Sequence, residues 1–232
     1  MVELESAVNY PRESENPWTA IAIGSALTLF SVLLLPAVLL VGYYQRVLRA
    51  SMDDEAVPVF DDWGDLFVEG LKAVVVVVAY SLVPALVIGA SIASAAGAVL
   101  GDGGLLSGAL ALGALFGVLL GGLLGLVLWY VAPAGLANLA RTGRIASAFA
   151  LGDLRHTLVH RDYAVSWLVA LGVVFVAGIV TSVFNLVPFG FVLGIPVTFY
   201  AAVVAFHLYG RGVAAAGPAP DASDRPDGRA AV

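Results

Sequence analysis

Three side chains in the second half of the chain have the types and spacing of a metal site. Asp153, His156 and His160 follow one another at i, i+3 and i+7, so on a helix they would share one face. Ligands of this kind could hold zinc and leave one coordination position open. An H-x-x-x-H pair without a glutamate base is also explained by solvated histidines beside Arg155 and Arg161 at a membrane surface. We favour this second interpretation and keep metal binding as its alternative.

Other catalytic chemistry finds little support in the residues. Cysteine is absent, which excludes disulfides and thiolate metal sites. We recognise no nucleophile–base pair, no phosphate loop and no haem motif, and no carboxylate lies within the long apolar runs, where ion-coupled pumps place them. The net charge of −6 argues against nucleic acid as a partner. We therefore expect a protein that is not an enzyme and carries no cofactor.

The stretch VFDDWGDLFVEGLKA, residues 59–73, has an acidic and aromatic pattern. Asp61 or Asp62 can cap a helix, because a carboxylate accepts hydrogen bonds from free N-terminal amides. At helical spacing the side chains then divide into an apolar face, with Trp63, Leu66, Phe67, Gly70 and Leu71, and an acidic face, with Asp62, Asp65 and Glu69. This predicts a short amphipathic helix in the headgroup region, anchored by Trp63, that runs into the next apolar segment through Lys72.

The acidic face of this helix needs a partner, since anionic headgroups give it no attraction. The acids either pack on basic residues of the protein itself, such as Arg46, Arg141 or Arg144, or offer a surface to another protein. We favour self-packing and keep docking as the alternative. The interfacial and docking set comprises Asp61, Asp62, Trp63, Asp65, Phe67 and Glu69.

These residues must be positioned by membrane helices. The chain is 60% hydrophobic and 12% charged, whereas a soluble domain is about half apolar and a quarter charged. About 20 apolar residues span a bilayer. The uncharged runs predict five spans, at about 20–44, 72–99, 106–131, 165–184 and 187–209. The expected fold is an all-α polytopic bundle over residues 18–210, with two short interfacial cytoplasmic helices.

Basic residues predict the orientation of this bundle, because short loops rich in Lys and Arg stay in the cytoplasm. The turns at 100–104 and 185–190 contain none. The basic residues that set the topology are Arg46, Arg49, Lys72, Arg141, Arg144, Arg155, Arg161 and Arg211. With five spans, the tail at 1–17 would be outside the cell membrane and a disordered tail at 211–232 inside. Acid excess with a single lysine also suits a high-salt, halophilic cytoplasm.

Small residues recur every fourth position in two of the predicted spans, which lets helix backbones approach closely. The third span carries Gly113, Gly117, Gly121 and Gly125, and the second carries Gly89, Ala93 and Gly97. We favour packing within one chain. The alternative is a seam between copies in a homo-oligomer.

Two segments share a local pattern. WGDLFVEGL precedes the second span and LGDLRHTLV precedes the fourth, each after a basic stretch. Parallel repeats of this kind occur in some transporters, although chance explains a shared triplet equally well. We expect a scaffold or accessory subunit in the lipid bilayer, contacting a membrane or cytoplasmic protein. The alternative is a transporter or permease-like subunit with two parallel halves.

Four segments resemble a family of multi-pass membrane proteins from archaea and bacteria, defined by a domain of unknown function. They are YPRESENPW, GYYQRVLRA, PVFDDWGDLFVEGLKA and GRIASAFALGDL, and the resemblance spans about residues 8–210. The DDWGDLFVEGLKA segment is the most specific of these. The resemblance implies an integral protein of the cell membrane, often archaeal and halophilic, and brings no activity or catalytic residues.

Overall fold

A computed structural model describes residues 4–14, 16–101 and 103–217. The regular elements in these residues are all helices, which confirms the predicted all-α fold. The longest are α4 (Trp63–Leu100), α5 (Leu105–Thr142), α7 (Arg161–Phe184) and α8 (Phe191–Ala216). The shorter ones are α1 (Leu4–Asn9), η1 (Tyr10–Arg12), α2 (Pro17–Leu29), α3 (Leu34–Met52), η2 (Ile145–Phe149) and α6 (Leu151–Val159).

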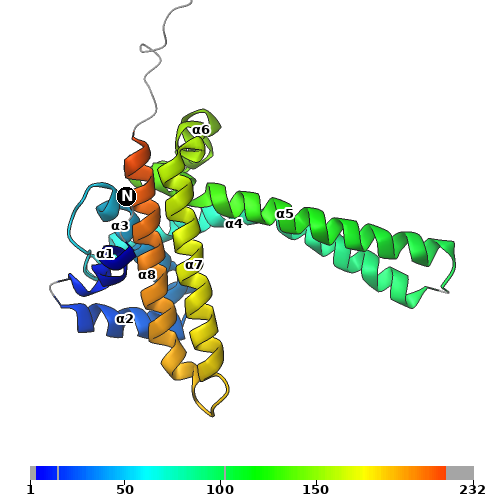
Figure 1. The fold of residues 1–232 in the computed structure, drawn as a ribbon, viewed down its shortest axis with the longest axis horizontal. Coiled ribbons are helices and arrows are strands. Elements are labelled where there is room, and N and C mark those ends of the chain that lie inside the picture. The colour runs from blue at the N-terminus through cyan, green and yellow to red at the C-terminus, as the bar shows by residue number, and fades with distance from the viewer. Residues whose placement is uncertain (1–3, 15, 102, 218–232) are drawn as a thin grey trace, which may run out of the picture.

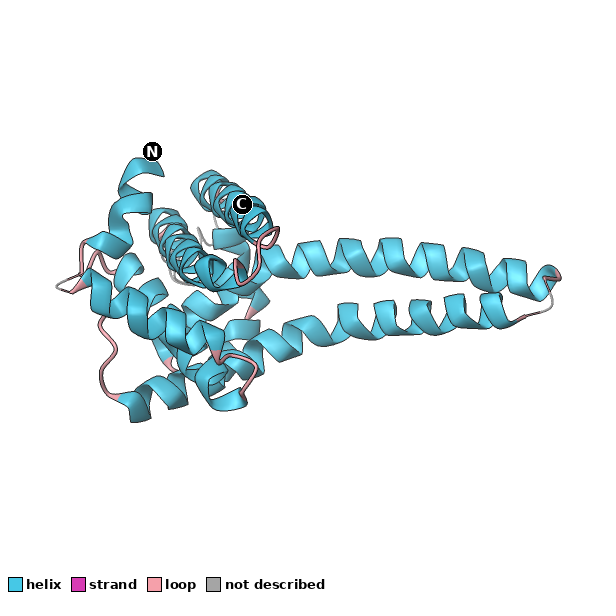
Figure 2. Ribbon diagram, turned by 90° about the horizontal axis from the view of Figure 1, so that it is seen from below, coloured by secondary structure: helices cyan, strands magenta, loops and turns pink. Residues whose placement is uncertain are grey.

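The four long helices pair as hairpins. α4 and α5 lie side by side and project away from α7 and α8, which also run side by side (Figures 1 and 2). Each of these four helices is long and apolar enough to cross a bilayer, and they correspond to the second to fifth predicted spans, the last of which begins at Phe191 rather than at residue 187. The chain is therefore a multi-helix membrane protein.

The first predicted span has a different structure from the expected one. Residues 20–44 do not form one helix: α2 ends at Leu29, and α3 begins at Leu34 after an extended Leu33. Pro36 explains the break, because in a continuous helix its ring would clash with the carbonyl of Val32 and it has no N–H to donate. In the first turn of α3 the same proline is tolerated.

The core lies where the two hairpins meet α3. Leu48, Val76, Ala137, Tyr163 and Leu208 come from five different helices, and each is 0% exposed. We call this region the packed end. Beyond it the hairpins expose apolar side chains to their surroundings, which for membrane helices is lipid.

The N-terminal segment lies against the packed end. Ala7 belongs to the same buried cluster as Leu48, and the Tyr10 ring stacks on His207 of α8 with centroids 3.8 Å apart. The Tyr200 hydroxyl donates to the Val8 carbonyl. The N-terminal segment therefore lies beside the middle of α8 (Figure 1), an arrangement that one span over 20–44 does not predict.

The C-terminal boundary also differs from the prediction. Helix α8 continues to Ala216, so residues 211–216, which were expected to begin a disordered tail, are helical. Residues 218–232 of that predicted tail lie outside the described part of the chain.

Candidate functional site

Four charged side chains join α3, the following loop and α4. Arg46 contacts Asp61 at 2.7 Å and Glu69 at 3.0 Å, and Arg49 contacts the second oxygen of Glu69 at 3.0 Å. The Arg46 and Glu69 side chains are only 15% and 22% exposed, so water screens their contact less than it would on an open surface. We call Arg46, Arg49, Asp61 and Glu69 the charged cluster.

Two glycines bring the helices close enough for this cluster to form. Gly42 of α3 faces Gly70 of α4, and both are buried. A Cβ atom at Gly42 would overlap the backbone carbonyl of Leu66, and one at Gly70 would overlap that of Val38. Only glycine permits such an approach of two helix backbones. Our sequence reasoning missed this pair.

The end of α5 is attached to the same region by polar contacts to its backbone. Arg49 donates to the Ala140 carbonyl, and Lys72 donates to the Gly143 carbonyl, at 3.0 and 3.1 Å. Gln45 donates to the Leu136 carbonyl at 3.0 Å. Cations are favourable at a helix C-terminus, where carbonyls lack partners. These polar side chains therefore join α3 and α4 to the end of α5.

The first turn of α4 presents an exposed surface beside the cluster. The helix begins at Trp63, as expected, but Asp62 has φ +42° and its side chain makes no capping hydrogen bond. The predicted capping role of Asp61 is replaced by its ion pair with Arg46. Asp62 and Asp65 are exposed, and Trp63 is 46% exposed. We call Asp62, Trp63 and Asp65, with the exposed Val68 and Leu71 further along α4, the acidic–aromatic surface.

Aromatic packing fixes the base of this surface. Phe60 stacks on the buried Tyr43 with ring centroids 4.0 Å apart, and Trp63 lies 6.1 Å from Phe60. The Tyr43 hydroxyl donates to the Pro58 carbonyl in the loop at 3.2 Å. Phe67, which we included in the docking set, is half-buried and contributes less to the exposed face.

The predicted metal candidates do not converge. Helix α6 ends at Val159, and His160 has an extended backbone at the bend before α7, so it leaves the helix face of Asp153 and His156. His160 instead lies beside Asp162, with nitrogen and oxygen 3.7 Å apart. Among the described residues, no three His, Cys, Asp or Glu side chains are placed to hold a metal ion.

The two GDL triplets have a similar placement within their helices. Leu66 and Leu154 are 0% and 1% exposed, whereas Asp65 and Asp153 are exposed. The first triplet lies in the same helix as the span that follows, but the second lies in α6, which a bend separates from α7. The two triplets therefore bury the leucine and expose the aspartate in the same way, but they are connected differently to the long helix that follows.

A family model described as a protein of unknown function, DUF4013, matches residues 27–186. The chain belongs to the DUF4013 family. No curated protein and no solved structure matches the chain. The DUF4013 match contains α3 to α7, and with them the charged cluster, the acidic–aromatic surface and both GDL triplets.

The glycine face of α5, also within the DUF4013 match, packs on α4. Positions 117 and 121 lie against Ser91 and Ile88, and a Cβ at Gly113 or Gly125 would make ordinary contacts with Ser94 or Pro84. Helix α4 does not contact α5 through the full set of small residues that the sequence predicted, which were Gly89, Ala93 and Gly97. A Cβ at Gly89 would meet open space, Ala93 is exposed, and only Gly97 lies near α5, against Leu110.

The remaining basic residues lie around the packed end. Arg211 pairs with Asp54 at 2.6 Å, which joins the end of α8 to the loop after α3. The other predicted topology residues are exposed between the end of α5 and the start of α7: Arg141, Arg144, Arg155 and Arg161.

One side-chain pair was missed by sequence reasoning. Ser51 Oγ lies 2.9 Å from His207 Nδ1, a distance at which a serine and a base can share a proton. The two residues are 156 positions apart, and Ser51 lies within the DUF4013 match while His207 lies beyond it. Ser51 is 2% exposed and also donates to the Val47 carbonyl, so the pair is enclosed by helices.

Tyr10 covers the other side of this pair. Burial raises the pKa of Tyr10 above its ordinary value, and the nearby Ser51 hydroxyl opposes that shift. The phenol therefore stays protonated at neutral pH and acts as a packing surface for the His207 ring. The contact attaches the N-terminal segment to α8.

Proposed function

We propose that this DUF4013 protein is a non-enzymatic scaffold or accessory subunit that presents its acidic–aromatic surface to a protein partner. The observation that carries the proposal is the division of the acids along residues 61–69. Asp61 and Glu69 are engaged by arginines, whereas Asp62 and Asp65 remain exposed beside Trp63. Self-packing thus describes Asp61 and Glu69, and docking is proposed for Asp62 and Asp65.

The chemistry of this surface favours a partner with basic residues. Exposed tryptophan is enriched among the residues that dominate binding energy, and uncompensated carboxylates attract cationic partners and speed their association. The charged cluster holds the start of α4 against α3, so the surface needs little ordering when it binds.

We also propose an orientation in the cell membrane with both termini in the cytoplasm. The support comes from the break between α2 and α3 and from the contact of the N-terminal segment with the middle of α8. In this orientation α2 and α3 enter the membrane and return, and only the two hairpins cross it. The basic residues of the packed end are then on the side that the positive-inside rule predicts.

An archaeal, high-salt cytoplasm is part of the same proposal. The exposed charged surface is rich in acids and has a single lysine. Partly buried pairs such as Arg46–Glu69 persist at ionic strengths that screen exposed pairs, because salt reaches them poorly.

The test is affinity purification of the full chain from native membranes in mild detergent at high salt. The variant is Trp63→Ala combined with Asp65→Arg, which alters the exposed surface and leaves the charged cluster intact. Asp153→Arg is the matched control, since Asp153 is the exposed aspartate of the second GDL triplet. A stoichiometric partner lost only from the double variant supports the proposal. Identical partners for all three proteins, inserted at equal levels, would overturn it.

A pocket between the hairpins favours one second candidate, a passive transporter. The pocket has a volume of about 410 Å³ and is lined by Pro84 of α4, Pro133 of α5 and Ala202 of α8. Proline at membrane depth frees a carbonyl and allows a helix to open such a space. The test is swelling of reconstituted vesicles in small neutral solutes. Swelling that Ala202→Phe abolishes would support transport, and swelling equal to that of empty vesicles would exclude it for those solutes.

A further inference from the structure

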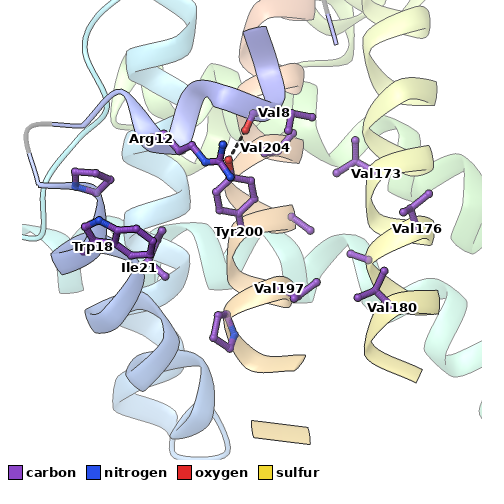
Figure 3. A pocket seen from close by; sticks show the side chains of 14 residues that line it. Val8, Arg12, Trp18, Ile21, Val173, Val176, Val180, Val197, Tyr200 and Val204 are labelled. Carbon is purple, nitrogen blue, oxygen red and sulfur yellow. Dashed lines mark hydrogen bonds between the residues drawn. The ribbon is translucent and has the colours of Figure 1, made fainter. Parts of the chain in front are cut away.

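A groove runs between the N-terminal segment and the α7–α8 hairpin (Figure 3). Its volume is about 670 Å³, and it extends along α8 from Pro196 to Val204, a rise of about 12 Å. One wall consists of Val173, Val176 and Val180, which lie on one face of α7. The groove is therefore long, narrow and apolar along most of its length.

The groove has a cationic end. Arg12 lines it at the level of Tyr200, where the Tyr200 hydroxyl donates to the Val8 carbonyl (Figure 3). Arg12 is exposed, and within the described residues no carboxylate forms an ion pair with it. Its neighbour Glu13 lines a separate pocket beside the charged cluster. The guanidinium is thus available to an anion from outside the chain.

The groove lies along the middle of α8, where the chain exposes apolar side chains. Trp18, at the mouth, is 82% exposed, and tryptophan concentrates where the headgroups meet the hydrocarbon. Val176, further along the wall, is 58% exposed on a helix that is long and apolar enough to span the bilayer. An amphiphile could therefore enter sideways from the lipid, with its polar part at Arg12 and its chain on the valines.

We propose that this groove binds an anionic membrane lipid. One acyl chain lies along the valines of α7 and α8, and the negative headgroup contacts Arg12. The charge of Arg12 selects the anionic headgroup, because a guanidinium binds phosphate or carboxylate oxygens through charge-assisted hydrogen bonds. The bound lipid would connect the N-terminal segment to the hairpin that it covers. Neither the docking surface on α4 nor the transport pocket is needed for this site.

The test counts lipids bound to the full chain by native mass spectrometry in nonionic detergent. Phosphatidylglycerol and phosphatidylcholine with the same acyl chains are the probes, and glycerol 3-phosphate is the chain-free control. We expect phosphatidylglycerol to bind more tightly, and Arg12→Gln to weaken it by about tenfold, the effect of losing one strong polar contact. Val197→Trp, which fills the groove, should weaken both lipids. Arg155→Gln, which removes an exposed arginine of α6, should change neither.

Several results would overturn the proposal. Equal affinity for the two lipids, unchanged by Arg12→Gln, would show nonspecific apolar binding. Displacement of phosphatidylglycerol by glycerol 3-phosphate would show a site for free phosphate. A dimer that Val197→Trp converts to monomer would show that a second copy of the chain fills the groove. Thermal unfolding without added lipid confirms that each variant is folded before its lipids are counted.

Discussion

Replacement of Glu69 by glutamine should destabilise the protein measurably, because this carboxylate joins two arginines. The substitution preserves shape but removes the charge that accepts from Arg46 and Arg49 at 3.0 Å each. Hydrogen bonds to charged groups contribute about 1.5–3 kcal/mol each. Partial exposure reduces these contributions, and the glutamine oxygen still accepts one bond, so we expect a loss of about 2 kcal/mol.

The assay is thermal unfolding of the purified protein in mild detergent. A loss of about 2 kcal/mol corresponds to a fall in Tm of roughly 4–8 °C for a chain of this size. The matched control is Asp65→Asn, one turn earlier on α4 and exposed, which should change stability by less than about 0.5 kcal/mol. The difference should persist in high salt, since the cluster is partly buried. Equal Tm values for the two variants would refute the role assigned to the charged cluster.

The remaining predictions concern close packing and buried hydrogen bonds, and thermal unfolding in detergent checks each of them. Gly42→Ala should lower the free energy of unfolding by roughly 3 kcal/mol, because its Cβ would overlap the Leu66 carbonyl. Gly89→Ala, whose Cβ would meet open space, should be neutral or stabilising, and equal effects of the two variants would contradict the α3–α4 contact. Tyr80→Phe should cost about 1–2 kcal/mol by leaving the Ala148 carbonyl without the phenol, and no change would show that water replaces it. Ser51→Ala should lower the free energy of unfolding by about 1 kcal/mol and loosen the N-terminal segment. Added protease should then cleave that segment faster, and unchanged cleavage would contradict its attachment through His207.

The long helices could be predicted from uncharged apolar runs, because a helix that crosses a bilayer must be apolar over about 20 residues. The runs at 72–99, 106–131 and 165–184 each lie within one helix, and the run at 187–209 does so from Phe191 onward, as expected for segments that must satisfy all backbone groups internally. The start of α4 at Trp63 followed equally from the residues around it. The break at residues 30–33 did not follow from hydropathy, which is high on both sides. Pro36 carried that information, but a proline can kink a membrane helix as well as end it.

The site was harder to predict because its partners come from distant segments. The acids of residues 61–69 were found from their helical spacing, and Arg46 was one of the basic residues expected to meet them. The pairing of Gly42 with Gly70 could not be predicted, since the two glycines are 28 positions apart and no local pattern links them. Ser51 and His207 meet only because α3 and α8 cross in the fold. Asp153, His156 and His160 were only an alternative ligand set, and α6 ends before His160.

The central claim is that the packed end, with both termini, faces the cytoplasm while the turns of the two hairpins face outward. The absence of native cysteine makes single-cysteine labelling with an impermeant maleimide direct. Glu5→Cys and Arg155→Cys report on the packed end, and Leu105→Cys and Leu186→Cys report on the hairpin turns. We predict that intact cells label positions 105 and 186, and that positions 5 and 155 react only after permeabilisation. Labelling of position 5 in intact cells with protection of position 155 would contradict the account, because residues 20–44 would then cross the membrane.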